Sequence, residues 1–112
     1  MANNFKVVTK DGSSVNANTD MTIHTGASST ETTIIGMTVA NIVNSQITVD
    51  VKLENASGDN VFMVKNAPIP AGSSLVVVGG DQKVVLEASD VIKVQSDTAN
   101  SADTILSILE IT

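Results

Sequence analysis

The stretch "QITVDVKLEN", residues 46–55, alternates apolar and polar side chains along its whole length. Ile47, Val49, Val51 and Leu53 are separated by polar or charged neighbours. Successive side chains of a β-strand point to opposite faces of the sheet, so this pattern is typical of a strand with one buried and one solvated face. A helix would scatter the same four side chains around its circumference. The stretch therefore predicts an antiparallel sheet.

Turn signals on either side divide the rest of the chain into short strands. "NASGDN" (55–60) predicts a tight turn, which makes a hairpin of 47–54 and "VFMVK" (61–65). "TTIIGMTVANI" (32–42) is apolar on both faces, as in a central strand, and Gly36 indicates a bulge within it. We expect about eight strands in all, with 16–25 only weakly patterned; the remaining segments are 5–9, 75–78, 82–88, 90–96 and 103–112. Regularly spaced short strands of this kind predict an all-β, antiparallel sandwich or barrel.

The stretch "NAPIPAGSSLVVVGG" (66–80) ends in a glycine pair that could bind a ligand or turn the chain. A phosphate loop would need its glycines to open a helix, whereas here a strand follows. Pro68 and Pro70 fit an edge strand or a strand entry. We expect "AGSS" to form a turn, "LVVV" to be a short buried strand, and Gly79-Gly80-Asp81 to supply the positive φ angles of the next hairpin.

Length and composition predict one domain, residues 1–112, with an aliphatic core. The chain is 42% hydrophobic and has no cysteine, which excludes disulfides and thiolate metal sites. No apolar run approaches the ~20 residues that span a bilayer. The start, "MANNFKVVTKDG", does not have the pattern of a signal peptide, so we expect assembly inside a cell.

The charge and the aromatic content exclude several classes of binding protein. The net charge is -6, and every basic residue is a lysine. Nucleic-acid binding depends on neutralising phosphates, and arginine is its most versatile donor, so we expect no nucleic-acid partner. Phe5 and Phe62 are the only aromatic residues, too few for a stacking platform. We also expect no membrane partner.

No arrangement of residues in the sequence predicts a catalytic, cofactor or metal site, and we expect no enzyme. His24 is the single histidine; alternation with Ile23 predicts that it faces solvent on an edge strand, without a nucleophile beside it. Asn55, Asp59 and Asn60 form at most a weak calcium loop. The methionines at 21, 37 and 63 are interpreted as core residues.

The first and last strands of the chain have apolar residues on both of their faces, and the last strand has them at five positions. Ile105, Leu109 and Ile111 alternate with Leu106 and Ile108. A small sandwich has a single interior, so this pattern indicates that another chain covers some apolar surface. The alternative is a strand at the centre of its own sheet, for which the same pattern would be expected.

Much of the chain from about Thr32 onward resembles small virion structural proteins of tailed bacteriophages, many from marine and cyanobacterial phages. The resemblance rests on "NAPIPAGSSLVVVGGDQKVVLEASDVIKVQS" followed by "ADTILSILEIT", and on "TTIIGMTVANI" followed by "ITVDVKL". It implies a β-sandwich of jelly-roll type, present in many copies on the particle, and it brings no catalytic residues with it.

We therefore expect a non-enzymatic virion protein, first of all a capsid decoration or cement protein, assembled in the host cytoplasm. The expected partners are copies of itself, with a trimer favoured, and the major capsid protein or other virion proteins. The alternatives are a neck, collar or tail (fibre-associated) protein and, less favoured, a carbohydrate-binding adhesin.

Overall fold

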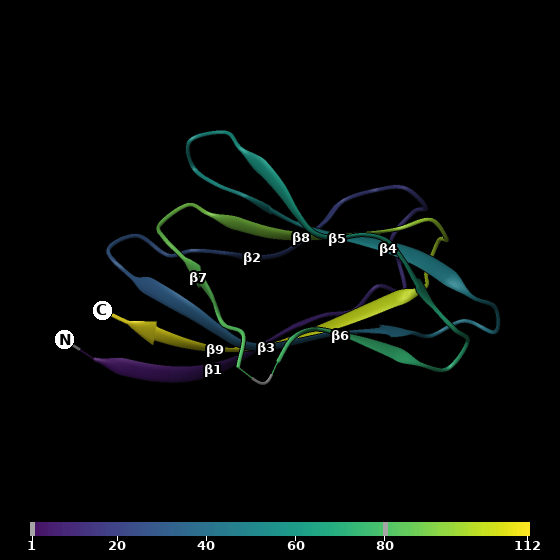
Figure 1. Cartoon of the computed structure of the whole chain (residues 1–112), viewed down its shortest axis with the longest axis horizontal. Coiled ribbons are helices and arrows are strands. Elements are labelled where there is room, and N and C mark those ends of the chain that lie inside the picture. The colour runs from purple at the N-terminus through teal and green to yellow at the C-terminus, as the bar shows by residue number, and fades with distance from the viewer. Residues whose placement is uncertain (1, 80) are drawn as a thin grey trace.

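The residues described by this computed structural model, 2–79 and 81–112, form nine β-strands in two layers and contain no helix (Figure 1). None of those residues therefore belongs to a helix able to cross a bilayer. The strands are β1 Asn3–Lys10, β2 Met21–Thr25, β3 Glu31–Asn41, β4 Ile47–Glu54, β5 Asn60–Ile69, β6 Ser74–Val78, β7 Val84–Leu86, β8 Val91–Ser96 and β9 Ala102–Ile111.

The strands build two antiparallel sheets, which lie one above the other in Figure 1. Sheet A has the order β1-β9-β3-β6, with β7 also paired to β3, and sheet B has the order β2-β8-β4-β5. These two strand orders, in which the chain passes repeatedly from one sheet to the other, are those of a jelly roll, a double sheet built from two Greek keys. The predicted jelly-roll-like sandwich is confirmed.

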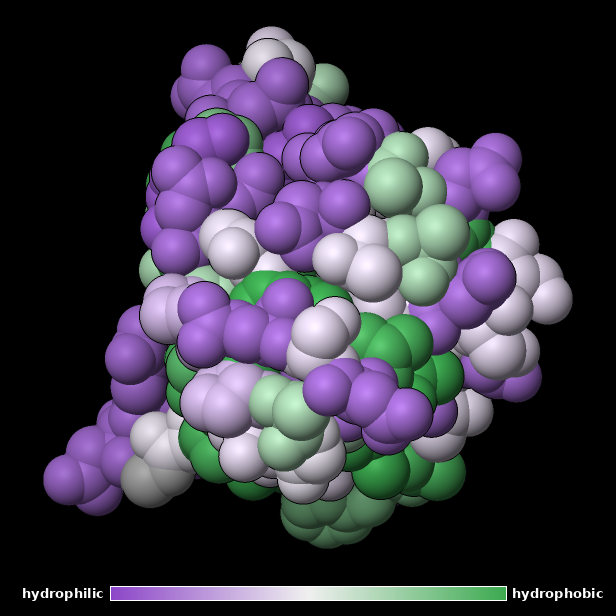
Figure 2. All heavy atoms as spheres, turned by 90° about the vertical axis from the view of Figure 1, so that its right-hand side faces the viewer, coloured by the Kyte–Doolittle hydropathy of each residue, from purple (hydrophilic) through white to green (hydrophobic). Residues whose placement is uncertain are grey.

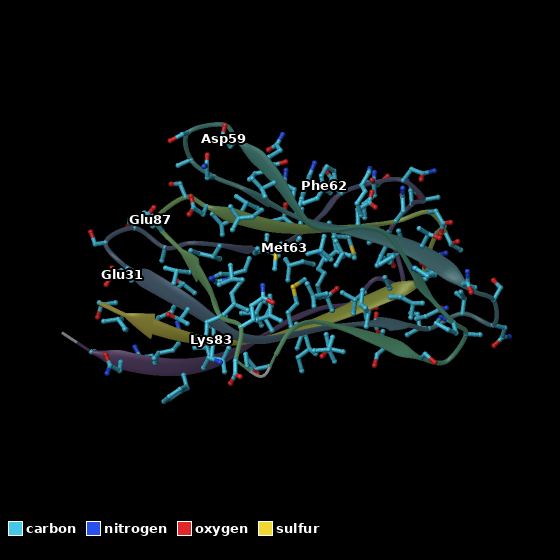
Figure 3. All side chains as sticks on the ribbon, viewed as in Figure 1. Glu31, Asp59, Phe62, Met63, Lys83 and Glu87 are labelled. Atoms are coloured by element: carbon cyan, nitrogen blue, oxygen red, sulfur yellow. The ribbon has the colours of Figure 1, made fainter. Side chains whose placement is uncertain are left out.

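The core lies between the sheets and consists almost wholly of aliphatic side chains (Figure 3). The alternation that predicted β4 is confirmed, because Ile47, Val49 and Val51 are completely buried. Met21 and Met37 are also buried, and Met63 packs against the core from β5, as expected for methionines that fill irregular gaps.

β3 is the central strand that the sequence predicted. It pairs with β9 on one side and with β6 and β7 on the other. Its register with β9 shifts between Ile34 and Gly36, which confirms the predicted bulge. A Cβ atom at Gly36 would meet only the Val78 carbonyl oxygen at 3.8 Å, so the bulge does not depend on glycine.

The predicted turns around β5 are confirmed. β4 and β5 form the hairpin, and the Asn55 side-chain oxygen accepts hydrogen bonds from the Ser57 and Asp59 amides within its turn. Pro68 lies on β5, an edge strand of sheet B. The "AGSS" turn closes with a 3.1 Å hydrogen bond from the Ser73 amide to the Pro70 carbonyl, and Gly72 has a φ of 73°.

Three expectations from the sequence were wrong in detail. "LVVV" belongs to β6, an edge strand of sheet A, and Val76 is 65% exposed rather than buried. β6 and β7 form no hairpin with each other; they pair one after the other with the same side of β3. Gly79 has no positive φ, and Gly80 lies outside the described residues. In the weakly patterned segment 16–25, only Met21–Thr25 is a strand.

Candidate functional site

The outer face of sheet A carries a broad apolar surface. Strand register places three rows of side chains across it, because directly paired residues of antiparallel strands point to the same face. The rows are Phe5-Leu109-Thr33-Val85, Val7-Ser107-Gly36 and Thr9-Ile105-Thr38-Val76. No residue of these rows carries a charge. These three rows therefore cross sheet A, from β1 to β6 and β7, without a charged side chain.

Five large side chains of these rows are exposed, and we call them together the apolar face. Their exposed fractions are 76% for Phe5, 64% for Val7, 65% for Val76, 56% for Val85 and 47% for Ile105. The alternative explanation for the apolar residues of the last strand was a central position in its sheet, and β9 does lie at the centre of sheet A. Ile105 on its outer side nevertheless remains exposed. A central position therefore does not account for the apolar residues on both of its faces.

Charged residues bound the apolar face at its two ends. Glu31 follows the first row, opposite Ile111, and Asp103 follows the third row, opposite Ala40. The Asp103 carboxylate accepts a 2.8 Å hydrogen bond from the Gly12 amide, so it also fixes the loop after β1. The apolar face is consequently a bounded patch within sheet A.

Sheet B presents the opposite character on its own outer face. Its ion pairs join Lys52 to Asp20 at 3.0 Å and to Glu54 at 3.4 Å, Lys93 to Glu54 at 3.0 Å, and Lys65 to Asp50 at 3.4 Å. Figure 2 views one end of the molecule, where hydrophilic residues dominate the upper, sheet B side and hydrophobic residues gather toward the lower, sheet A side. The two faces are suited to different surroundings.

The ion pairs on sheet B shift the pKa values of two of their members. The hydrogen bond from Lys52 to Asp20 raises the pKa of the lysine, and the Glu54 carboxylate adds to this effect. Glu54 accepts hydrogen bonds from Lys93 and Lys52, which lower the pKa of its carboxyl group. Each charge is held by its partners, as in a solvated structural network.

Two hollows open on the ends of the sandwich. One, of about 500 Å³, lies between loops that include Glu31, Asn55, Glu87 and Asp90. The Asp90 carboxylate already accepts hydrogen bonds from the Ala56 and Glu87 amides, at 3.0 and 2.9 Å. Figure 3 shows Glu31 and Glu87 at the same end of the molecule. The Asp90 carboxylate therefore has a structural role, because it joins two turns.

The second hollow, of about 290 Å³, continues the apolar face toward the loop after β1. Its walls include Thr9, Thr38 and Ile105 of the third row, together with Lys10 and Asp103. That end of the apolar face is therefore concave, and a protruding surface of another protein could fill it.

His24 lies on the edge strand β2 as predicted, but the expectation that it faces solvent was wrong. The register of β2 against β8 shifts between Thr22 and His24, which turns the ring partly inward. The side chain is half-buried, and its Nε2 atom is buried without a hydrogen-bond partner. A general base would need a hydrogen-bonded nucleophile or water at such an atom.

The two aromatic residues lie on opposite outer faces of the sandwich. Phe5 is on sheet A, whereas Phe62 pairs with Lys52 on sheet B and has the Lys65 ammonium 4.5 Å from its ring centre. Figure 3 shows Phe62 on the upper, outer side. The two rings therefore cannot stack on one ligand.

Sequence reasoning found part of this surface. It singled out the first and last strands, β1 and β9, but it missed Val76 and Val85, because their exposure depends on β6 and β7 lying along β3. That arrangement brings together residues far apart in the chain, and no local pattern indicates it.

Comparison with known proteins gives likenesses to solved structures at low sequence identity. No protein-family model matches the chain, and no curated protein matches it in sequence. A protein from work on Bacillus endospore appendages, which form disulfide-linked pili, superposes with a TM-score of 0.49 and 11% identity, over 99% of this chain and 87% of that one. A chain of infectious bursal disease virus, strain Gx, superposes with a TM-score of 0.48 and 9% identity. That match covers 96% of this chain and 31% of the viral one.

Neither likeness carries an argument about function at these scores and identities. The sandwich is established by the strand pairing of the chain itself. The resemblance to phage virion proteins has no support from a family model.

Proposed function

We propose that the chain is a non-enzymatic structural subunit that packs its apolar face against another protein of a larger assembly. The observation that carries the proposal is the set of three uncharged rows on the outer face of sheet A, on which Phe5, Val7, Val76, Val85 and Ile105 are exposed. Soluble monomers seldom leave a contiguous apolar surface of more than a few hundred Å² uncovered. A flat sheet face with a shallow hollow suits a protein partner better than a small ligand.

The finer part of the proposal is that the assembly is a phage particle and that the chain decorates or cements its head. The resemblance described above supports this choice, and the difference between the two faces is compatible with it. The apolar face would lie on the major capsid protein or on a neighbouring copy, while the ion-paired face of sheet B would meet solvent. Bridging neighbouring capsomers in this way would brace the shell. A trimer is the favoured oligomer of this proposal.

Fold alone does not choose this function, because jelly rolls also occur in lectin and cupin domains. The first alternative is a neck, collar or tail protein, and copy number separates it from a head protein. Quantitative mass spectrometry of purified particles should give a copy number of this chain that is proportional to the number of capsomers in the head. A number that matches a single ring would favour the neck or tail instead.

The weaker alternative, a carbohydrate-binding adhesin, is disfavoured by the separation of Phe5 from Phe62 on opposite faces. A glycan array with the purified protein tests it. Robust and selective binding to one class of glycan would replace the structural proposal.

The direct test of the apolar face places charge on it. The double variant Ile105→Lys/Val76→Lys adds two ammonium groups to the third row, where burial against a partner would leave them unpaired. We expect this variant to fold but to be lost from sedimented particles. The matched control, Thr48→Lys/Gln95→Lys, adds the same charge to the outer face of sheet B and should be incorporated normally. Equal incorporation of the two variants would contradict the proposed role of the apolar face.

A further inference from the structure

The four sheet edges of the sandwich differ in how far they are protected from pairing with another chain. Natural edge strands are blunted by short length, bulges, prolines or interruptions. β2 is five residues long and has a register shift at Thr22/His24. β5 contains Pro68, and its register with β4 shifts twice. The β6 and β7 edge is interrupted after Val78, with a further shift between Met37 and Thr38 on β3.

β1 lacks all of these devices. It is eight residues long, contains no proline and pairs with β9 in a register that continues from Asn3 to Lys10 without a shift. Every residue of the strand except Val8 is exposed. Within the described part of the chain, β9 is the one strand that pairs with it. β1 therefore offers a long, regular and unobstructed edge.

The hydrogen-bond phase of β1 identifies which backbone groups are free on this edge. The amides of Ala2 and Thr112 donate to each other's carbonyl oxygens at 3.2 and 3.0 Å, so these two residues form a hydrogen-bonded pair. Hydrogen-bonded and non-hydrogen-bonded pairs alternate along an antiparallel ladder. Even-numbered residues of β1 consequently bond to β9, while Phe5, Val7 and Thr9 direct their N–H and C=O groups outward.

An inward-pointing charge at an edge can also discourage pairing. Lys10 and Lys6 both share the inner side of sheet A, since they pair with the buried residues Thr104 and Ile108. Lys10 is the last residue of the strand, so Lys6 is the lysine within it that could act in this way. Its ammonium group is 2.7 Å from the Glu110 carboxylate, so its charge is compensated within its own chain. Lys6 thus affects the register of a pairing more than it prevents pairing.

We propose that a second copy of this chain binds along β1, antiparallel and about a twofold axis, with Val7 opposite the partner's Val7. Pairing of β1 with the partner's β1 joins two unobstructed edges. A heterologous contact would instead join β1 to one of the other edges, each of which is short, bulged or interrupted. Self-pairing gives the outward amides and carbonyls of Phe5, Val7 and Thr9 their missing partners. It also joins two copies of sheet A, and hence two apolar faces, into one continuous surface.

The register follows from charge and overlap. Pairing about a twofold axis keeps the inner faces together whichever residue lies on the axis, and Phe5, Lys6, Val7 and Val8 are the four central residues of β1. Val8 on the axis sets Lys6 opposite the partner's Lys10, which brings like charges together. Lys6 on the axis sets two ammonium groups directly opposite each other, which is unfavourable. Phe5 on the axis leaves most of the second half of β1 unpaired. Val7 on the axis overlaps nearly the whole strand and places Lys6 opposite the partner's Val8.

This inference goes beyond the proposed function, because it rests on backbone groups of β1 and holds whatever the apolar face binds. It also differs from the trimer in its consequence. Pairing through β1 alone gives a dimer, whereas the proposed function favours a trimer. Sedimentation equilibrium distinguishes a dimer from a trimer by mass.

The test compares Val7→Pro with Val7→Ala. Proline removes one outward N–H at a position where β9 receives no hydrogen bond, so the fold should be retained while pairing is lost. Alanine keeps that N–H, so this variant should still form dimers. By sedimentation equilibrium at high protein concentration, the natural chain and Val7→Ala should form species of twice the mass of those formed by Val7→Pro, which are monomers where the apolar face makes no contact between copies. Equal masses for Val7→Pro and the natural chain would overturn the proposal.

Hydrogen exchange in the natural chain gives a readout that needs no substitution. As concentration rises through the dimer range, the amides of Phe5, Val7 and Thr9 should slow to about one tenth of their low-concentration exchange rate or below. The amides of Lys6 and Val8 are already protected at low concentration. Outward amides that stay rapidly exchanging at every concentration would overturn the proposal, whatever the oligomeric mass.

Cysteine substitution tests the register, since the chain has no cysteine of its own. Val7→Cys should form an intermolecular disulfide under mild oxidation, because directly opposed Cα atoms lie within about 5.5 Å. Phe5→Cys should not, because its cysteine would oppose the partner's Thr9. Efficient cross-linking of Phe5→Cys in place of Val7→Cys would overturn this register.

Discussion

Asn41 shows how one buried polar side chain fixes the end of a strand. It is 4% exposed, and its Nδ2 atom donates to the carbonyl oxygens of Ser45 and Ile69 at 2.8 and 3.0 Å. Its Oδ1 atom accepts a 2.9 Å hydrogen bond from the Val43 amide. The residue therefore ties the end of β3 to the following loop and to the end of β5.

Asn41→Ala should destabilise the protein by about 3 kcal/mol, because it leaves one buried and two partly buried backbone groups without their partners. Denaturant unfolding followed by circular dichroism measures the change. Asn44→Ala, at an exposed position in the same loop, is the matched control and should change stability by less than about 0.5 kcal/mol. Equal effects of the two substitutions would show that the Asn41 hydrogen bonds contribute nothing specific.

Gly26 is required by a close backbone approach. A Cβ atom there would collide with the Glu87 carbonyl oxygen, and the Gly26 amide donates to the Asp90 carbonyl at 2.8 Å. Gly26→Ala should therefore lower thermal stability by an amount equivalent to about 2 kcal/mol or more, since neither backbone segment can move freely. Gly36→Ala, whose Cβ atom would have ordinary contacts, should leave the melting temperature nearly unchanged. A tolerated Gly26→Ala would mean that the two loops are not held together as described.

Glu54 should contribute to the stability of the protein in a pH-dependent way. Its hydrogen bonds with Lys93 and Lys52 place its folded-state pKa below the ordinary value of 4.5. Its contribution is thus complete above that value and is lost as the pH falls through the lower, folded-state pKa. Glu54→Gln should make the acid-side decline of stability shallower, measured by urea unfolding at a series of pH values. Glu31→Gln on sheet A is the control, and an identical change there would assign the effect to net charge instead.

At the scale of elements, β9 has two sides with different roles. Leu106 is completely buried between the sheets, whereas Ile105 is 47% exposed on the apolar face. Leu106→Ala should cost about 3 kcal/mol of folding stability, and Ile105→Ala should cost less than about 1 kcal/mol. The second substitution should instead weaken incorporation into the assembly. Unfolding curves and particle sedimentation measure the two effects separately, and comparable stability losses would contradict this division.

The elements that the sequence predicted are those whose signals are local. β4 followed from strict alternation, its hairpin with β5 from the "NASGDN" turn, and the bulge in β3 from Gly36. The edge position of β6 and the shared pairing of β6 and β7 with β3 were missed. An apolar "LVVV" has the same pattern in a buried strand and in an edge strand whose outer side is exposed. Only the long-range pairing partner separates these two cases.

At the scale of the whole molecule, the sequence predicted the kind of functional surface better than its extent. The apolar residues on both sides of β9 indicated surface to be covered by another chain, and Ile105 does lie exposed on it. The joining of Phe5, Val76 and Val85 to the same face depends on the jelly-roll order of the strands. That order is set by non-local contacts, which a single sequence does not display.

The division between an uncharged sheet A face and an ion-paired sheet B face predicts how association depends on salt. Apolar contact and backbone pairing through β1 are little affected by screening, whereas attraction through the charges of sheet B would weaken as the Debye length falls from about 10 Å to about 3 Å between 0.1 and 1 M salt. Excluded salts such as sulfate strengthen apolar burial. Association measured by sedimentation should therefore persist in concentrated sodium chloride and become stronger in sodium sulfate. Dissociation in sodium chloride would show that the lysines and carboxylates of sheet B, such as Lys52 and Glu54, form the contact.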